Sequence, residues 1–170
     1  YELIDHMFAS LSKSFKTRKI HVGMDEAYML GRGKHMDIHG YETVDSIMKR
    51  HLARVCEIAK KYGYEPMMWS DMFFRISNHG EYYGRTVNLP QELIDGVPDV
   101  SLVYWDYYHE DQETYDRHIN QHKQFNNPII FAGGAWRWLG HGPALVKSVY
   151  QTRYALKSCI ENGVEEVFVT

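Results

Sequence analysis

The chain has 170 residues, of which 44% are hydrophobic, and a formal net charge of −3 at pH 7. This composition predicts one soluble globular core and excludes both a disordered chain and a membrane-spanning one. The small acidic excess removes the usual electrostatic basis for binding nucleic acid or an anionic membrane, so we expect neither partner.

Hydrophobic periodicity predicts helices that alternate with short strands. Apolar residues at four-residue spacing predict an opening helix over 3–15, and a longer pattern over 44–62 ends at Gly63, a residue suited to closing a helix. A third helix is predicted over 115–125, and a fourth begins with Pro143 in its first helical position. The strands are predicted at 19–23, 65–70, 101–105, 129–132 and 166–169, with a short turn at 91–94.

Strands that alternate with crossover helices specify a parallel sheet, which is either doubly wound or closed into a barrel. Polar and aromatic residues follow several successive strands, and this is typical of barrel enzymes. No glycine-rich turn of the dinucleotide-binding type is present, which disfavours the doubly wound fold. Only five strands are predicted, whereas eight close such a barrel. We therefore expect an α/β fold in which residues 1–170 form a fragment of a single TIM (β/α)8 barrel domain.

Two adjacent carboxylates, Asp25 and Glu26, stand where the first predicted strand runs out into a loop. Adjacent residues leave a strand on opposite faces, so the two carboxylates can address different atoms of one substrate. A carboxylate pair with divided roles is typical of glycoside cleavage. The 13 tyrosines and 4 tryptophans favour the same interpretation, because sugar rings bind to flat aromatic surfaces. The alternative is a polar strand end that faces water.

The segment from His21 to Ala27 resembles the His-x-Gly-x-Asp-Glu motif of family-20 glycoside hydrolases, the β-N-acetylhexosaminidases. Residues 68–71 are similar to the Trp-x-Asp ending of the next strand in that family, and residues 104–108 and 133–138 resemble a subgroup of bacterial exo-hexosaminidases. The resemblance covers essentially the whole chain and implies barrel strands four to eight. The chain departs from the family pattern by omission, since it lacks the first three strands, a basic residue that grips sugar hydroxyls, and the aromatic-bearing loop after the eighth strand.

The resemblance implies a retaining exo-acting enzyme that hydrolyses terminal β-linked N-acetylglucosamine or N-acetylgalactosamine from glycans or glycosides. The substrate's own acetamido oxygen attacks the anomeric carbon, and an oxazolinium intermediate forms. Glu26 is then the acid that protonates the leaving group and the base that activates water, while Asp25 accepts from the acetamido N–H. Asp25 is expected to stay ionised while Glu26 keeps its proton. The other hypothesis is a carbohydrate-binding protein with the same fold and no turnover.

The same resemblance gives aromatic residues a place in the pocket. Trp69 and Trp105 are expected to wall the acetamido group, and the alternative for each is core packing. Tyr104 or Tyr107 is expected to donate to the acetamido carbonyl, and strand alternation lets only one of the two face the pocket from a regular strand.

Five further positions carry candidate supporting roles. Asp71 and Asp106 are candidates for binding sugar hydroxyls, and the alternative is ordinary hydrogen bonding at strand ends. Trp136 or Trp138 is expected to stack on a sugar face while the other packs under the loop. His21 is expected to bind substrate or to hydrogen-bond behind the site, and a satisfied core histidine is the alternative.

Two rival motifs follow the acid pair. His35, Asp37 and His39 have the spacing of a metal site on an extended segment, but no fourth ligand is recognisable, so we expect no metal and no cofactor. The glycine-rich run at 31–34 lacks the full phosphate-loop spacing and is interpreted as a solvated lid edge.

Cys56 and Cys159 fall in helical patterns and predict buried thiols. The localisation stays open; the lack of a disulfide pattern and of a signal peptide slightly favours the cytoplasm. An unclosed sheet leaves two edges, so the isolated fragment is expected to self-associate and to have little or no activity.

Overall fold

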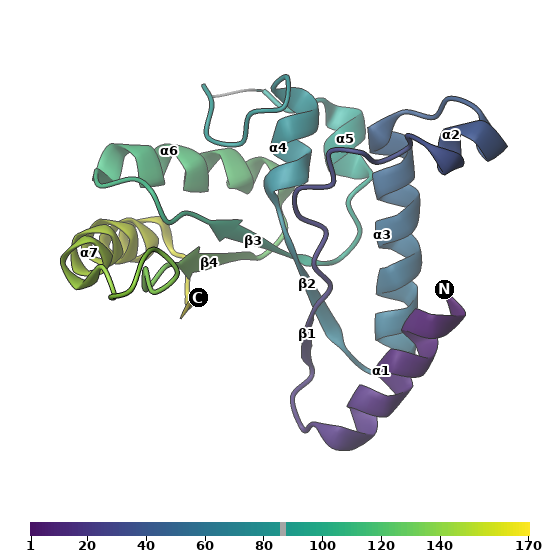
Figure 1. Ribbon diagram of the computed structural model, residues 1–170, viewed down its shortest axis with the longest axis horizontal. Helices are drawn as coiled ribbons and strands as arrows, with labels where there is room; N and C mark the ends of the chain where they lie inside the picture. The colour runs from purple at the N-terminus through teal and green to yellow at the C-terminus, as the bar shows by residue number, and fades with distance from the viewer. Residues whose placement is uncertain (86–87) are drawn as a thin grey trace.

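The computed structural model describes residues 1–85 and 88–170. Its centre is one sheet of five parallel strands, in which each strand pairs with the next along the chain (Figure 1). The strands are β1 (Lys19–His21), β2 (Glu65–Trp69), β3 (Ser101–Trp105), β4 (Ile129–Gly133) and β5 (Glu166–Val169). The helices are α1 (Glu2–Ser14), α2 (Lys34–His39), α3 (Val44–Lys61), α4 (Asp71–Ser77), α5 (Gln91–Asp95), α6 (Gln112–His122) and α7 (Leu145–Asn162), with a 3₁₀ turn, η1 (Lys123–Phe125).

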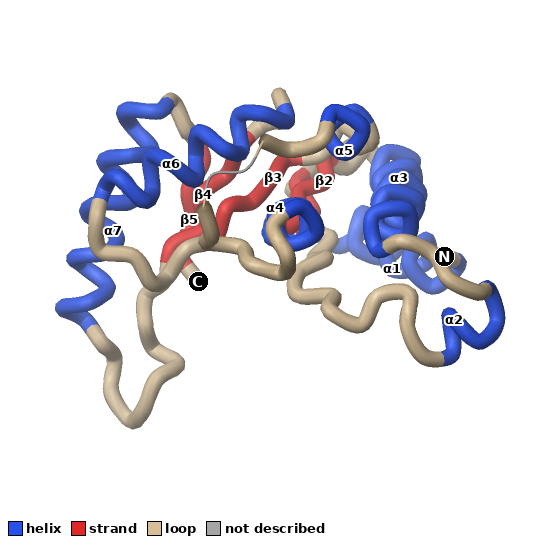
Figure 2. The backbone as a smooth tube through the Cα atoms, turned by 90° about the horizontal axis from the view of Figure 1, so that it is seen from above, coloured by secondary structure: helices blue, strands red, loops and turns tan. Residues whose placement is uncertain are grey.

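The sheet curls into a half-barrel. Lys19 on β1 forms an ion pair with Glu166 on β5, although these strands are the two edges of the sheet. One layer further along, the rings of Trp69 on β2 and Phe168 on β5 lie 6.0 Å apart, centroid to centroid. Helices α7, α6, α5 and α3 follow one another along the outer side of the strands (Figure 2). The prediction of a partial TIM barrel is therefore confirmed.

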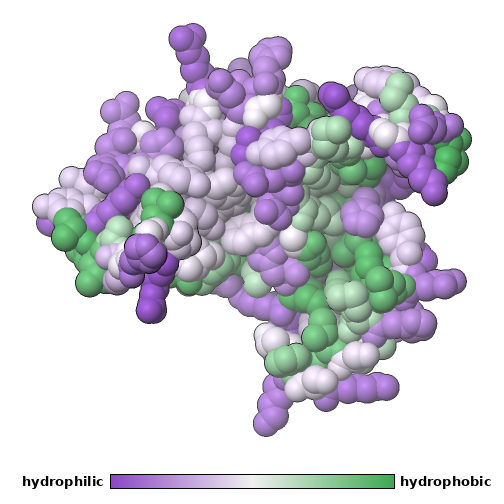
Figure 3. Space-filling model, in the orientation of Figure 1, coloured by the Kyte–Doolittle hydropathy of each residue, from purple (hydrophilic) through white to green (hydrophobic). Residues whose placement is uncertain are grey.

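Apolar side chains are exposed beside both edge strands. Figure 3 shows apolar atoms gathered over the region of α1 and β1, and Leu3 and Met7 of α1 are 72% and 51% exposed. At the other edge, Val167 and Val169 of β5 are 45% and 53% exposed. In a closed barrel such positions pack against neighbouring strands and helices. The exposed apolar residues therefore mark β1 and β5 as the unpaired edges of the half-barrel.

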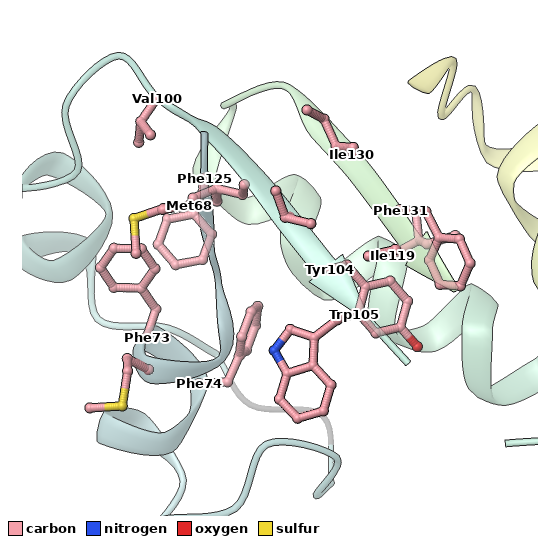
Figure 4. Packing of buried hydrophobic residues seen from close by; sticks show 14 of the residues in the cluster. Met68, Phe73, Phe74, Val100, Tyr104, Trp105, Ile119, Phe125, Ile130 and Phe131 are labelled. Carbon is pink, nitrogen blue, oxygen red and sulfur yellow. The ribbon is translucent and has the colours of Figure 1, made fainter. Parts of the chain in front are cut away.

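The main core lies between the outer face of the sheet and the helices. Met68, Phe73, Phe74, Ile119 and Phe131 are all less than 3% exposed and pack between β2, β3, β4 and the helices α4 and α6 (Figure 4). Each such side chain contributes about 1.5–3 kcal/mol by leaving water. This packing fixes the strands whose carboxyl ends carry the candidate site.

The predicted strands agree with the observed ones to within two residues, but three helices, α2, α4 and α7, differ from prediction. Helix α7 begins at Leu145 rather than at Pro143, because the preceding loop turns back and the Ala144 N–H donates to the carbonyl of Trp136 at 2.9 Å. Helix α4 begins at Asp71, directly after β2, where only a strand end was expected. None of the described helices is long and apolar enough to cross a membrane.

The segment that suggested a metal site is helical, as α2. The helix places the rings of His35 and His39 side by side, 4.8 Å apart, and His35 Nε2 lies 2.8 Å from the carboxylate of Glu42. No group of three or more potential metal ligands gathers within residues 1–85 and 88–170. Cys56 in α3 and Cys159 in α7 are buried free thiols, as predicted, and burial raises their pKa values to about 11 and about 12.

Candidate active site

The loop that carries the acid pair has an unusual backbone. Backbone pairing of β1 with β2 extends past His21, because the backbone N–H of Val22 donates to the carbonyl of Met67 and the backbone N–H of Trp69 donates to the carbonyl of Gly23. The chain then takes left-handed φ values of 75° at Gly23, 78° at Met24 and 49° at Glu26. For the two non-glycine residues this conformation costs about 1–3 kcal/mol each, so contacts elsewhere must hold the loop.

The acid pair borders a pocket at the carboxyl ends of β1, β2 and β3. The pocket has a volume of about 230 Å³ and is lined by Asp25, Glu26, Trp69, Trp105, Tyr107 and Tyr108. Both acids are exposed to solvent. Ligand pockets usually enclose about 300–1,000 Å³. The half-barrel therefore presents part of a pocket wall, with two carboxylates and two indoles turned toward the same space.

Glu26 is held by three neighbouring groups. The Tyr28 hydroxyl donates to Glu26 Oε1 at 3.1 Å, and Arg75 Nη2 lies 3.7 Å from the same oxygen. The backbone N–H of Glu26 donates to Asp71 Oδ2 at 3.1 Å. The carboxylate is thus beside a cation and a hydroxyl donor while its side chain stays half exposed.

Asp71 is fully buried beneath this loop. Burial raises the pKa of its carboxyl, and the Glu26 backbone N–H, the Arg75 guanidinium and the Trp105 indole act in the opposite direction. Because Asp71 is 0% exposed and binds groups of the chain itself, the structure places it behind the pocket rather than on its surface.

Two tryptophans form part of the pocket lining. Trp69 contacts the His21 ring at a centroid distance of 4.4 Å and is partly exposed. Trp105 is 9% exposed and packs against Tyr83 and Tyr107, with ring centroids 5.6 and 5.5 Å away. Both indoles therefore belong to the core and to the pocket lining at once.

The two tyrosine candidates lie on different sides of β3. Tyr104 is fully buried, packs against His118 and His122 of α6, and leaves the strand in a different direction from Trp105 (Figure 4). Tyr107 lines the pocket, and its partial burial raises the pKa of its hydroxyl. Of the two tyrosines, only Tyr107 is thus in position to meet a ligand.

Asp106 shapes the loop that carries Tyr107. Its carboxylate accepts from the Tyr104 hydroxyl at 2.7 Å and from the Tyr108 backbone N–H at 3.0 Å, and it pairs with His109 Nδ1 at 2.7 Å. This pairing raises the pKa of His109. Asp106 is only 1% exposed, so the structure places it, like Asp71, behind the pocket.

His21 is partly buried beside Trp69 and is not among the residues that line the pocket. Its Nδ1 accepts from the Gly23 N–H at 3.0 Å, and burial lowers the pKa of the ring, so the imidazole is neutral near pH 7. Its Nε2 is buried and has no hydrogen-bond partner among the described residues.

Trp136 lies outside the pocket lining. It is 3% exposed, its indole N–H donates to Gln151, and the Lys147 ammonium sits 3.6 Å above its ring. Trp138 is 46% exposed and contacts both Trp136 and Tyr107. Trp136 is therefore the tryptophan that packs under the loop.

Sequence reasoning missed Arg75, Tyr28 and Tyr108. Arg75 follows Asp71 by four residues, a spacing that brings side chains together on a helix, but the signal required α4 to be predicted first. Tyr28 is two residues beyond Glu26 in an irregular loop, where no periodicity predicts a contact.

Comparison with known proteins gives limited similarity. No protein-family model and no curated protein matches the chain. A GH20 exo β-N-acetylglucosaminidase from Vibrio harveyi, solved in complex with N-acetylglucosamine, is similar in structure with a TM-score of 0.47 and 16% identity over 78% of this chain and 18% of that one. A β-N-acetylhexosaminidase from Bacteroides fragilis NCTC 9343 gives a TM-score of 0.44 and 14% identity over 78% of this chain and 24% of that one. The chain thus corresponds to about a fifth of the length of the structures that it matches.

Proposed function

We propose that this chain supplies the acid-bearing part of a retaining exo-β-N-acetylhexosaminidase, within a single (β/α)8 domain. The observation that carries the proposal is the pocket itself, in which Asp25 and Glu26 meet Trp69, Trp105 and Tyr107 at the carboxyl ends of three parallel strands. Catalytic groups of barrel enzymes come from that end of the strands. The substrates are glycans or glycosides with a terminal β-linked N-acetylglucosamine or N-acetylgalactosamine.

The proposed reaction begins with attack by the substrate's acetamido oxygen on its own anomeric carbon. As that bond forms, the bond to the leaving group breaks and Glu26 gives its proton to the departing oxygen. Asp25 accepts from the acetamido N–H and offsets the positive charge that develops in the oxazolinium ring. Tyr107 donates to the acetamido carbonyl oxygen, while Trp69 and Trp105 enclose the methyl group.

The second half-reaction returns the proton. Glu26 takes a proton from water, the oxygen of that water attacks the anomeric carbon, and the oxazolinium ring opens to the free acetamide. Two displacements at the same carbon give net retention of configuration. The adjacency of the two acids supports this route, because neighbours on one strand end are poorly placed to flank a sugar ring from opposite sides as an acid and a nucleophile must.

Release of nitrophenol from 4-nitrophenyl β-N-acetylglucosaminide and from the galactosaminide tests the proposal in the full-length protein. Proton NMR of the first-formed sugar is expected to show the β anomer. Appearance of the α anomer first would overturn the substrate-assisted route. Binding of N-acetylglucosamine without any release of nitrophenol would instead establish a carbohydrate-binding protein.

A further inference from the structure

Helix α4 begins at the carboxyl end of β2, and two of its side chains contact Glu26 in the loop after β1. Asp71 is the first residue of this helix and Arg75 lies one turn later. Asp71 Oδ2 accepts from the Glu26 backbone N–H at 3.1 Å and from Arg75 Nε at 3.0 Å. One buried carboxylate oxygen therefore ties the strained backbone of Glu26 to the arginine.

Arg75 is fixed on its other sides as well. Its Nη1 donates to the carbonyl of Gly80 at 2.9 Å, and its guanidinium carbon lies 5.2 Å from the ring centre of Tyr28 and 5.8 Å from that of Tyr82. Its side chain is only 15% exposed, unlike a mobile surface arginine. With Nε and Nη1 engaged, the remaining Nη2 is the nitrogen that approaches Glu26 Oε1.

We infer that Asp71 and Arg75 are positioning residues for Glu26: Asp71 fixes the backbone of Glu26, and Arg75 holds a positive charge beside its carboxylate. This inference rests on the proposed function, in which Glu26 alternates between acid and base. A fixed cation favours the ionised carboxylate, which exists after Glu26 has given its proton to the leaving group and before it takes one from water. The pair thus holds Glu26 in place and stabilises its charge between the two proton transfers.

The groups around Glu26 define what the test must separate. Asp25 and Tyr28 come from its own loop, Asp71 and Arg75 from α4, and Tyr107 and Tyr108 line the same pocket from the loop after β3. Arg75 is the cation in this set. Loss of its charge is therefore expected to move the pH dependence of the reaction toward higher pH.

The experiment compares Arg75→Gln and Arg75→Lys in the full-length protein, with hydrolysis of 4-nitrophenyl β-N-acetylglucosaminide followed across pH. Arg75→Gln is expected to lower kcat about tenfold with little change in KM, and to move the alkaline limb of the kcat profile to higher pH. Arg75→Lys keeps the charge and is expected to keep the limb near its wild-type position. Arg54→Gln, which breaks an exposed ion pair with Glu57 on α3, is the control and should match the wild type.

An alkaline limb that stays in place in Arg75→Gln, or that moves equally in Arg75→Lys, would overturn the inference. Two measurements do not depend on turnover. In the wild-type protein, the Glu26 amide is expected to exchange slowly with solvent because it donates to a buried carboxylate, and fast exchange would contradict the role of Asp71. By carbon NMR at one fixed pH, the Glu26 carboxylate carbon should change its chemical shift in Arg75→Gln and not in Arg54→Gln, and an unchanged chemical shift in Arg75→Gln would contradict the role of Arg75.

These two NMR readouts also separate the inference from the proposed function. A protein without turnover whose Glu26 behaves as expected in both readouts refutes the enzyme and retains the positioning network. An active enzyme in which Arg75→Gln changes neither the alkaline limb nor the Glu26 carboxylate chemical shift retains the function and refutes the network.

Discussion

Acidification from pH 7 to pH 5 is expected to destabilise the fold through two buried histidines. His118 and His122 of α6 are 1% and 0% exposed and pack behind β3, against Tyr104. The His122 Nδ1–H donates to the carbonyl of His118 at 2.7 Å, and its Nε2 lies 2.7 Å from Ser70 Oγ. Burial lowers the pKa of His118 to about 4 and that of His122 to about 3, from an ordinary value of 6.5.

The sign and size of the effect follow from these values. Between pH 6.5 and pH 4 the unfolded chain binds a proton at each histidine and the folded chain does not, so stability falls as pH falls. At pH 5 each histidine lowers the free energy of unfolding by about 2 kcal/mol, and the two together lower it by about 4 kcal/mol. His109, whose pKa is raised by its bond to Asp106, acts in the opposite sense and offsets part of this loss. Domains are stable by about 5–15 kcal/mol, so the loss is a large share of the total.

Urea unfolding followed by tryptophan fluorescence at pH 7 and pH 5 measures the effect, with two protein concentrations used to detect any contribution from association. His122→Gln removes one titrating group, so its loss of stability between the two pH values should be about 2 kcal/mol smaller than in the wild type. His6→Gln, at an exposed position of α1, is the control and should leave the loss unchanged. Equal pH dependence in the wild type and His122→Gln would refute the reasoning.

Two other expected outcomes concern the pocket wall and the open sheet. A Cβ added at Gly134 meets Trp138 Cη2 at 2.7 Å and Tyr107 Cδ1 at 3.0 Å, so Gly134→Ala should displace the tyrosine and lower kcat/KM about tenfold, as measured by nitrophenol release. Gly142→Ala, which meets nothing within 4 Å, should leave kcat/KM unchanged, and equal effects of the two variants would contradict this account. Because both edge strands are unpaired, the 170-residue chain by itself should scatter light as a species larger than its 20.0 kDa monomer, and it should show little or no turnover. A monodisperse monomer, or activity equal to that of the full-length protein, would show these expectations to be wrong.

The strands could be predicted because they depend on hydrophobic periodicity, which extends over many residues, and the barrel class because polar and aromatic residues follow several successive strands. The position of Asp25 and Glu26 at a strand end followed from the same periodicity. Helix α4 was missed because it has only seven residues, and Ser70 and Asp71 alone separate its apolar run, Met72 to Phe74, from β2. Arg75 was missed with it.

The details of the pocket depend on geometry that no local pattern specifies. The left-handed backbone of Glu26 is held by a hydrogen bond to Asp71 of a distant helix, so it has no signature in the neighbouring sequence. Alternation along β3 limited the choice between Tyr104 and Tyr107, but only the packing of α6 shows which of them faces the helix. The fold of the loop at Trp136 depends in the same way on its contacts with α7.

The central claim is that Glu26 and Asp25 carry out substrate-assisted hydrolysis, and the most direct measurement is the turnover of 4-nitrophenyl β-N-acetylglucosaminide by three forms of the full-length protein. Glu26→Gln and Asp25→Asn are each expected to reduce kcat at least about 100-fold relative to the wild type, with melting temperatures near the wild-type value. Wild-type turnover that survives either substitution, or a wild-type protein that releases no nitrophenol, would contradict the claim.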